Sequence, residues 1–291
     1  MSTLPPGTLL AERYEIVRAL SSGGMGHVYE ARDLRLAQSP CAIKQLIDNA
    51  MEGENNALAE RKFNDEMRFL SGLSHPGIPR IRDFFTHQDM RFLVMDLVSG
   101  STLLDELERQ EGRGLTPAMV GADAIDVLNV LVYLHGQQPP IIHRDIKPSN
   151  LIRHADNGRV RVVDFGIARE HATGNATTQT QVGTLSYAPL EQIKGHAEPR
   201  SDLYALGVTM HHLLTGVPPQ PLCVEPLRQV RPDIDPALAT IVDRALEADP
   251  THRFDSAAEM RSALQQWLDG RDITVAVNPE APPPSPRPAA Q

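Results

Sequence analysis

The chain has 291 residues and carries 37 Asp and Glu against 28 Lys and Arg, which gives a formal net charge of −9. This acidic balance argues against electrostatic capture of nucleic acid, and a hydrophobic fraction of 41% argues against a disordered chain. A chain of this length can bury the core of one large domain or of two lobes.

The cysteines and the N-terminus bear on the cellular compartment. Cys41 and Cys223 are far apart and belong to neither a C-x-x-C motif nor a Cys/His cluster, so we expect no disulfide framework and no zinc knuckle. Residues 1–16 lack the basic and apolar regions of a secretory leader, and the sequence has no run of about 18 apolar residues. We therefore expect a cytoplasmic chain without a membrane span.

Short apolar runs alternate with turns over residues 13–47, which predicts a meander of antiparallel strands. Helical spacing of the apolar residues over 55–73 predicts one helix. Two more strands are expected over 78–85 and 91–98, before Ser99-Gly100 breaks the pattern. The first hundred residues thus predict a small sheet with one helix.

Beyond Gly100 the spacing of apolar residues becomes mainly helical. The predicted helices cover 103–109, 117–135, 202–214, 236–247 and 256–268. Two short apolar runs within 150–165 flank Asp156-Asn157-Gly158, which predicts a hairpin. The polar stretch 170–183 is typical of a functional loop, and the Pro-rich end 271–291 predicts an unpacked, disordered tail. The whole pattern predicts an α+β fold with a small antiparallel β-sheet lobe and a larger, mainly α-helical lobe.

A glycine-rich turn lies between the first two predicted strands. Ser22, Gly23, Gly24 and Gly26 would let backbone N–H groups approach a polyphosphate where side chains would clash. On its own, such a turn is more often a plain tight turn than a phosphate site. A Walker-type loop is excluded because the sequence has no G-x-x-x-x-G-K-[ST] motif.

Lys44 ends the apolar run Cys41-Ala42-Ile43 close to the glycine-rich turn, a position suited to pairing with phosphate oxygens. An edge lysine that extends its amine into solvent is the alternative. Glu66 favours the phosphate role, because a carboxylate on the apolar side of the following helix needs a charged partner. Glu60 is the second choice for that partner, since it has fewer apolar neighbours.

The segment 141–150, IIHRDIKPSN, carries the strongest functional signal. Asp145 can accept a hydroxyl proton, Lys147 can neutralise a phosphoryl group, and Asn150 can ligate a metal through its amide oxygen. Asp164, in an Asp-Phe-Gly sequence after a valine-rich strand, adds a second oxygen ligand across the predicted hairpin. A chance turn explains an isolated Asp-Phe-Gly, but it does not explain these motifs in this order.

The motifs SSGGMGHV, CAIK, FNDE, HRDIKPSN, DFG, GTLSYAPLE and SDLYALG, in this order, resemble those of Hanks-type serine/threonine protein kinases. The chain is most similar to the bacterial members, which open with a short RYEI strand. The resemblance covers 11–270 and implies the bilobal kinase fold, with an N-lobe over 11–98, a C-lobe over 99–270 and an extension over 1–10. It implies transfer of the γ-phosphoryl group of ATP to Ser or Thr hydroxyls of protein substrates, with Mg²⁺ as the metal and Mn²⁺ as its alternative.

The resemblance also implies roles for single residues of the phosphate and metal site. The glycine-rich turn would cover the ATP phosphates, while Lys44 would pair with those phosphates and with Glu66. Asn150 and Asp164 would hold the metal. Asp145 would orient the substrate hydroxyl.

The same resemblance implies how the substrate and the adenine ring are held. Lys147, two residues after the catalytic aspartate, follows the serine/threonine pattern, and Thr184 would bond near it. Met95 would be the gatekeeper, and the backbone of Asp96 and Val98 would bond the adenine. The apolar side chains around the ring would be Val28, Ala42 and Ile152.

Two contacts outside the catalytic steps are implied as structural supports. Asp202 would accept hydrogen bonds from the backbone of the His143-Arg144 loop, although an ordinary carboxylate at a helix N-terminus is an equal alternative. Glu191 would pair with Arg253.

Arg144, next to Asp145, predicts control by phosphorylation of the loop that follows. An arginine buried there needs an anion, which a phosphothreonine supplies. Thr178 and Thr180 are the expected phosphosites, with Thr177 behind them, and plain exposed polar residues are the alternative. Autophosphorylation between two copies makes a homodimer the expected partner state.

The sequence departs from the family pattern at three places. Ser21 replaces the first glycine of the usual G-x-G-x-x-G, which predicts modestly weaker ATP binding. Pro189-Leu190 precedes Glu191 where the family has Ala-Pro, so the local docking geometry is open. Residues 217–231 are Pro-rich and short where many relatives have a docking helix, so substrate selection is expected to differ.

Two other functions are alternatives to an active protein kinase. A pseudokinase that binds ATP as a scaffold predicts the loss of Lys44, Asp145 or Asp164, and all three are present. A small-molecule phosphotransferase of similar fold would lack the lysine after the catalytic aspartate and the segment 183–191.

Overall fold

The computed structural model describes residues 3–23, 26–46, 67, 70–88, 90–164 and 185–270. The Pro-rich tail, most of the helix expected over 55–73 and the side chains at positions 22 and 23 lie outside the described part. The other predicted site residues that lie outside it are Gly24, Glu66, Thr177, Thr178, Thr180 and Thr184.

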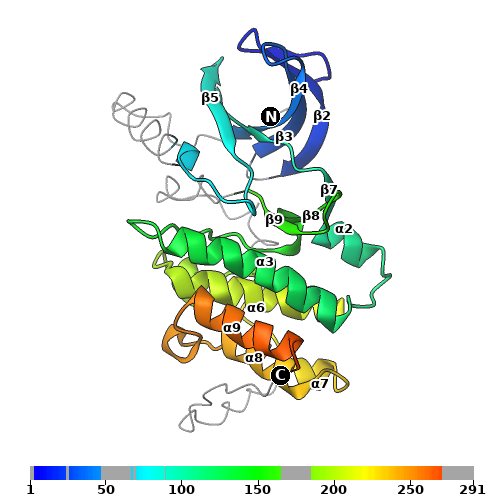
Figure 1. Ribbon diagram of the computed structural model, residues 1–291, viewed down its shortest axis with the longest axis vertical. Helices are drawn as coiled ribbons and strands as arrows, with labels where there is room; N and C mark the ends of the chain where they lie inside the picture. Colours follow the sequence, from blue (N-terminus) through cyan, green and yellow to red (C-terminus); the bar gives the residue numbers. More distant parts are fainter. Residues whose placement is uncertain are drawn as a thin grey trace, which may run out of the picture.

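A six-stranded antiparallel sheet forms the upper lobe in Figure 1, and a group of helices forms the lower lobe. The strands lie in the order β1-β2-β3-β4-β6-β5. They cover Leu9–Leu10 (β1), Tyr14–Gly23 (β2), Gly26–Asp33 (β3), Ser39–Leu46 (β4), Ile81–His87 (β5) and Met90–Asp96 (β6). The predicted meander is confirmed, and β1 adds a strand to it. The strand expected from Ile78 begins at Ile81, because the Ile78 N–H closes a turn onto the His75 carbonyl.

Residues 41–46 of β4 are all buried, because the sheet is covered on both faces. Cys41 and Ile43 belong to a small core inside the upper lobe. Side chains alternate along a strand, so Lys44 and Leu46 lie on the other face. Leu46 is part of the main core that continues into the helices. The lysine is therefore on the face of the sheet that meets the lower lobe.

The lower lobe contains the predicted helices and the predicted hairpin. The helices are Leu103–Glu108 (α2), Pro117–His135 (α3), Leu190–Ile193 (α5), Pro199–Thr215 (α6), Leu227–Val230 (α7), Pro236–Ala245 (α8) and Ala257–Leu268 (α9). A second antiparallel sheet consists of Gly100–Thr102 (β7), Leu151–His154 (β8) and Val160–Val162 (β9). Helix α6 begins three residues before the predicted Asp202, because Glu198 and Ser201 form a capping box ahead of the apolar run.

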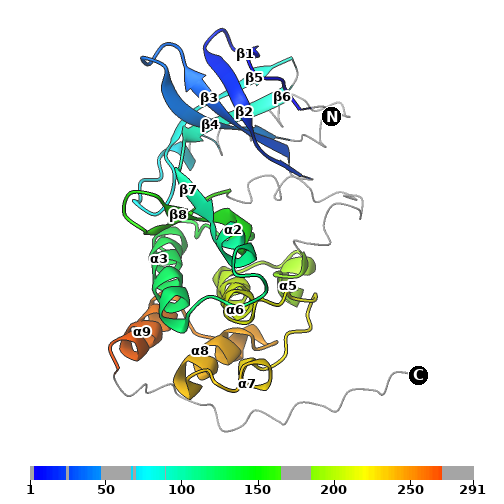
Figure 2. The ribbon, with the colours of Figure 1, turned by 90° about the vertical axis from the view of Figure 1, so that its right-hand side faces the viewer.

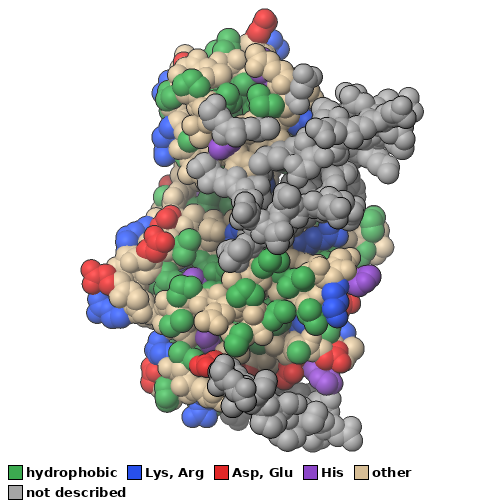
Figure 3. All heavy atoms as spheres, turned by 180° about the vertical axis from the view of Figure 1, so that it is seen from behind, with side chains coloured by type: hydrophobic (Ala, Val, Ile, Leu, Met, Phe, Trp, Pro, Cys, Tyr) green, Lys and Arg blue, Asp and Glu red, His purple; other side chains and the backbone are tan. Residues whose placement is uncertain are grey.

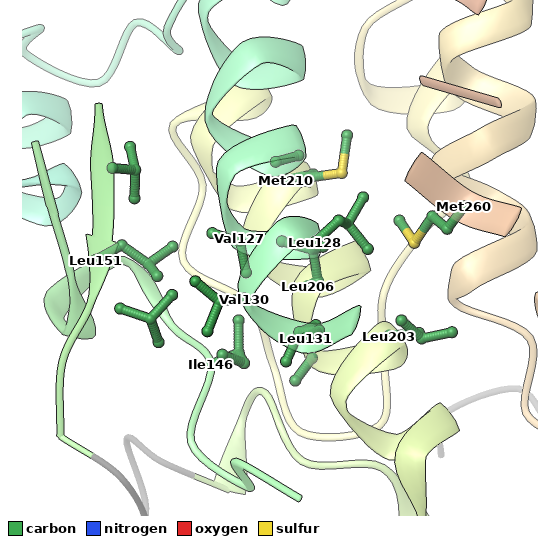
Figure 4. Close-up of a cluster of buried hydrophobic side chains, with 14 of the residues drawn as sticks. Val127, Leu128, Val130, Leu131, Ile146, Leu151, Leu203, Leu206, Met210 and Met260 are labelled. Carbon is green, nitrogen blue, oxygen red and sulfur yellow. The ribbon is translucent and has the colours of Figure 1, made fainter. Parts of the chain in front are cut away.

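The main core lies where α3 and α6 meet (Figure 4). Leu128 of α3 and Leu206 of α6 are fully buried in it, and Leu151 of β8 and Met260 of α9 enter from either side. Ile146 joins the same core from the loop between α3 and β8. The loop that carries the HRDIKPSN motif is thus anchored in the most buried part of the molecule.

Among the residues that the structure describes, α3 is the one helix long and apolar enough to cross a membrane, by length and composition alone. Its most apolar window has a mean hydropathy of 1.5, and 56% of that window is buried. Because α3 contacts α6, α9 and β9, its apolar character is explained by its place in the core. The Pro-rich stretch 217–231 contains only the single helical turn α7.

Candidate active site

The loop between α3 and β8 holds a cluster of polar side chains around Asp145. Asp145 is buried, with 4% of the residue exposed. Its Oδ2 accepts a hydrogen bond from Asn150 Nδ2 at 2.8 Å and lies 2.9 Å from Lys147 Nζ. Asn150 Nδ2 also donates to the backbone oxygen of Asp145 at 2.8 Å. These contacts fix the orientation of the carboxylate.

The catalytic loop is the loop between α3 and β8, and Asp202 of α6 holds its backbone. This fully buried carboxylate accepts hydrogen bonds from the backbone N–H groups of His143 at 2.9 Å and Arg144 at 2.8 Å. The expected contact is therefore confirmed. His135 Nε2 lies 2.9 Å from the same carboxylate, a contact that the sequence analysis missed.

The two residues before Asp145 are also held by specific contacts. His143 is fully buried, which lowers the pKa of its imidazole, and its Nδ1 accepts from the Asp145 N–H at 3.3 Å. Arg144 has a φ of 65°, a backbone conformation that most side chains avoid. Gln192 Nε2 of α5 donates to the Arg144 carbonyl at 2.9 Å. Helix α5 is thereby tied to the loop that carries Asp145.

Lys44 and Asp164 join the two lobes through a direct ion pair. Lys44 is 5% exposed, so its ammonium group is stabilised by this carboxylate rather than by bulk water. Asp164 follows β9 with a φ of 65°, and the neighbouring Val163 N–H donates to the Asn150 carbonyl at 2.9 Å. The structure thus brings together Lys44, Asp164 and the Asp145 loop, while Glu66 lies outside the described residues.

The predicted adenine-pocket residues share one face of the upper sheet. Val28 is the cross-strand partner of Lys44, and Ala42 is the partner of Met95. Cross-strand partners point to the same face, and Ala42 and Lys44 are two residues apart, so all four side chains lie on the face that meets the helices. These positions fit one side of a largely apolar nucleotide pocket.

The linker between the two sheets and the first strand of the hairpin complete this region. Val98 is buried in the linker, and Ile152 of β8 pairs with Thr102 of β7. The Asp96 carboxylate accepts from Arg82 Nε at 2.6 Å, and its backbone N–H donates to the Arg80 carbonyl. The linker is therefore fixed at its N-terminal end by β5.

The donor groups near Asp145 fit a hard divalent metal. Because the Asn150 amide nitrogen is committed to Asp145, the amide oxygen is the atom left for a ligand role. Asp164 supplies a carboxylate next to the same hairpin end. In the described part of the chain, no three His, Cys, Asp or Glu side chains form a closed metal cluster. Two oxygen ligands of this kind suit Mg²⁺ or Mn²⁺, which take further oxygens from water and substrate phosphates.

The segment 185–193, which includes α5, is anchored by a buried ion pair. Arg253 is 1% exposed, and its Nη1 lies 2.7 Å from Glu191 Oε1. The expected pair is confirmed, so the Pro189-Leu190 order does not disturb it. Pro189 simply precedes the first turn of α5, and Leu190 is exposed.

A pocket of about 410 Å³ lies beside this segment, between α2 and the end of α6. The Tyr187 hydroxyl and His212 Nδ1 are 2.7 Å apart in its wall. Burial lowers the pKa of His212 to about 4, and the neighbouring His211 contributes to this shift. The histidine is therefore neutral at pH 7. Leu104, Leu107 and two prolines make most of the remaining wall apolar.

The family model of the protein kinase domain matches residues 14–267. The chain belongs to the protein kinase domain family. This kinase domain is 36% identical over 272 residues to serine/threonine-protein kinase PknA of Nostoc sp., covering 88% of this chain and 48% of that protein. It is 36% identical over 295 residues to serine/threonine-protein kinase PknB of Mycobacterium tuberculosis, covering 94% of this chain and 45% of that protein. The resemblance to bacterial Hanks-type kinases is thereby confirmed.

Solved structures give the same result for the fold. The crystal structure of the Mycobacterium tuberculosis PknI kinase domain matches with a TM-score of 0.72 and 29% identity, covering 91% of this chain and 99% of that one. The bilobal kinase fold is thus confirmed. This kinase domain spans about half the length, or less, of the curated relatives it matches.

Sequence reasoning missed a buried charged network next to the hairpin. Arg153 of β8 donates to both Asp123 oxygens of α3 at 2.7 Å, and its Nε donates to Glu106 of α2. Burial raises the pKa of Asp123, while the bidentate pair keeps opposite charges in contact. The signal available was a lone arginine in an apolar strand, which requires a carboxylate partner.

Proposed function

We propose that this kinase domain transfers the γ-phosphoryl group of ATP to Ser and Thr hydroxyls of proteins, with Mg²⁺ as its metal. The observation that carries the proposal is the buried carboxylate of Asp145, which contacts Lys147 and Asn150 beside the Lys44–Asp164 pair. A base, a cationic group for phosphate and two oxygen ligands for a metal thus occur within one loop and one hairpin end.

Asp145 handles the substrate proton. Its carboxylate orients the Ser or Thr hydroxyl and accepts the proton as the hydroxyl oxygen attacks the γ-phosphorus. The new oxygen–phosphorus bond forms while the bond from the γ-phosphorus to the bridging oxygen of ADP breaks. Asn150 Nδ2 keeps the carboxylate aligned, because it donates one hydrogen bond to the Asp145 carboxylate and one to the Asp145 backbone oxygen.

Lys147 and Lys44 handle the phosphate charge. Lys147 Nζ lies 2.9 Å from Asp145 Oδ2. Its ammonium group can therefore approach the phosphoryl group during transfer and offset the negative charge of that group. Lys44 is placed to pair with the phosphates that stay on the nucleotide. Asn150 and Asp164 would hold Mg²⁺, with Mn²⁺ as the alternative, and the ion would neutralise phosphate oxygens.

The region around α5 supports a protein rather than a small-molecule acceptor. Hydrophobic side chains gather on the helical lobe in Figure 3, which is seen from the side of α5. Leu190 and Ile193 of α5 are exposed there. The pocket beside Tyr187 and His212 adds an apolar recess to the same side. A polypeptide substrate would cover such a surface, whereas a small molecule would not.

Regulation by autophosphorylation is part of the same proposal. Thr178, Thr180 and then Thr177 are the proposed phosphosites, and a phosphate there would pair with Arg144 next to Asp145. Phosphorylation of one copy by another makes a homodimer the proposed partner state. ATP dependence favours a cytoplasmic location.

The test is phosphotransfer by the purified chain. Wild type and Asp145→Asn are incubated with ATP and Mg²⁺, and phosphates are mapped by intact mass and peptide mass spectrometry. The variant should be slower by about 10²- to 10⁴-fold, because it loses the base while the amide keeps the shape. Mg²⁺ or Mn²⁺ added back after chelation should restore the wild type. Equal phosphotransfer rates in the wild type and Asp145→Asn would contradict the proposal.

A further inference from the structure

A cavity of about 580 Å³ lies on the side of the C-lobe opposite α5. It is bounded by α3, the β8–β9 turn, β9, α9 and the loop before β5. Figure 2 shows α3 and α9 on one side of α6 and α5 on the other. The cavity shares no residue with the Asp145 cluster or with Lys44. It is therefore a separate site, and its volume lies within the range of about 300–1,000 Å³ that is usual for ligand sites.

The cavity contains guanidinium groups that are not paired with a carboxylate of the described residues. Arg161 of β9 lines it and pairs with Ile152 of β8 through its backbone, but its side chain makes no hydrogen bond or ion pair with any residue that the structure describes. Arg261 of α9 donates one N–H to Asn129 Oδ1 at 2.8 Å, which leaves its charge uncompensated. Arg159 is already paired with Asp126 at 2.5 Å. Two guanidinium groups, those of Arg161 and Arg261, thus lack a carboxylate partner in the described part of the chain.

Asp126, the one carboxylate among the lining residues, is fully engaged. It accepts from the Val160 N–H at 2.9 Å as well as from Arg159. His75 adds a donor: its Nδ1 accepts from the Gly77 N–H at 3.0 Å, and burial lowers the pKa of the imidazole. The neutral ring therefore carries its proton on Nε2. The polar part of the cavity offers donors and needs an anionic acceptor.

The other part of the wall is apolar and held in place. Pro76, Val132 and Val160 line it, and the Tyr133 ring stacks on His75 with a centroid distance of 5.2 Å. The Tyr133 hydroxyl accepts from the Ser74 N–H at 2.9 Å, so this wall is preformed. An inorganic anion would leave these surfaces uncovered, whereas a phosphorylated side chain with an apolar neighbour in a peptide would cover both parts.

We propose that this cavity binds a phosphorylated peptide segment. The phosphate would contact Arg161 and Arg261, and an adjacent apolar side chain would lie over Pro76 and Val132. A phosphate is favoured over a carboxylate because its charge of nearly −2 matches two uncompensated guanidinium groups and its oxygens accept several bonds. On a chain with a net charge of −9, such binding depends on this local cluster and not on the overall field. The proposal is independent of phosphotransfer by the domain.

The test measures binding of a short fluorescein-labelled peptide with one phosphothreonine between leucines. Fluorescence anisotropy is recorded with the full chain in the absence of nucleotide, and the matched Thr and Glu peptides are measured in parallel. The phosphopeptide should bind most tightly, followed by the Glu and then the Thr peptide. Arg161→Gln and Arg261→Gln should each weaken phosphopeptide binding by roughly 10- to 100-fold, as expected for loss of charge-assisted hydrogen bonds.

Arg228→Gln is the matched control, because Arg228 is an exposed arginine on α7 outside the cavity. Arg228→Gln should bind the phosphopeptide like the wild type. Arg161→Gln should fold normally, because the Arg161 side chain makes no described hydrogen bond or ion pair that the substitution would remove. Wild-type affinity in both cavity variants would overturn the proposal, as would equal weakening by Arg228→Gln. Equal binding of the Thr peptide would also contradict it. Displacement of the peptide by inorganic phosphate at the peptide's own Kd would show that the site takes a free phosphate and not a peptide.

Discussion

The polar side chains of the β8–β9 hairpin differ in whether the protein supplies them with bonding partners. At one end, Asn150 and Asp164 are bonded to Asp145 and Lys44, which come from other elements. Toward the turn, the side chain of Arg161, in the middle of β9, has no hydrogen-bond or ion-pair partner among the described residues. Chemistry requires groups that neighbours hold in one geometry, whereas ligand capture requires donors that the protein has left unused. The same short element thus serves a fixed site at one end and an open one at the other.

The largest expected effect comes from breaking the fixed end through its support, Asp202. Asp202→Ala leaves the backbone N–H groups of His143 and Arg144 without an acceptor, which should cost about 2–6 kcal/mol in the free energy of unfolding. Because the catalytic loop then loses its anchor, phosphotransfer should fall by at least about 100-fold even in the folded fraction. Urea unfolding and single-turnover rates measure the two effects. A stable variant with full activity would show that the loop is held by its other contacts.

Glu191 separates structural support from catalysis. Glu191→Ala leaves the Arg253 guanidinium buried without its carboxylate, which should cost about 3–5 kcal/mol in stability. The rate per folded molecule should change far less than in Asp202→Ala, because neither residue touches the Asp145 cluster. Asp233→Ala is the matched control: the Asp233 side chain is 66% exposed, and Arg231 keeps its hydrogen bond to the Leu214 carbonyl, so loss of this ion pair should have little effect on stability. Thermal unfolding at pH 7 compares the two variants.

Much of the catalytic site was predictable from the sequence. The order of the motifs indicated the kinase fold, and this fold brings Lys44, Asp145, Asn150 and Asp164 to one site. The Asp202 and Glu191 contacts were predicted from the same resemblance. The phosphosites, Thr184 and Glu66 stay predictions. Helix boundaries were less accurate, since the start of α6 depends on the Glu198–Ser201 capping box and not on apolar spacing.

The Arg153 network shows what periodicity does not reveal. Helix α3 is buried around most of its circumference, so the apolar pattern does not indicate which face carries Asp123 toward β8. Arg153 and Asp123 are 30 positions apart, and their pairing depends on how the hairpin lies on the helix. The cavity with Arg161 and Arg261 is also a product of packing. Its donors come from β9 and α9, which no local sequence signal connects.

His212 predicts a pH dependence of stability. Its folded-state pKa is about 4, below the ordinary value of 6.5, so the unfolded chain binds the proton more readily between these values. The contribution to stability is therefore complete above pH 6.5 and is lost as the pH falls toward 4, to a maximum of about 3 kcal/mol. His212→Asn removes the titrating group, so the difference in Tm between variant and wild type should change across this window. A constant difference from pH 7 to pH 4 would contradict the assignment. Asp123 and Asp126, whose pKa values are raised by burial, act in the opposite direction in both proteins and cancel in the difference.

The smallest expected effect is that of Gly158→Ala in the turn of the β8–β9 hairpin, and Gly100→Ala in β7 is its comparison. Gly158 has a φ of 67° and open space where a Cβ would lie, so Gly158→Ala should cost only about 1 kcal/mol of backbone strain. A Cβ on Gly100 would lie 1.9 Å from the Arg153 carbonyl oxygen, so Gly100→Ala must push β7 away from β8. Since β7 follows the linker that carries Val98, Gly100→Ala should also raise the KM for ATP, whereas Gly158→Ala should leave it unchanged. Urea unfolding and ATP titration of both variants provide the measurement. Equal unfolding costs would show that β7 accommodates the added Cβ, and an unchanged KM in Gly100→Ala would show that β7 does not position the nucleotide pocket.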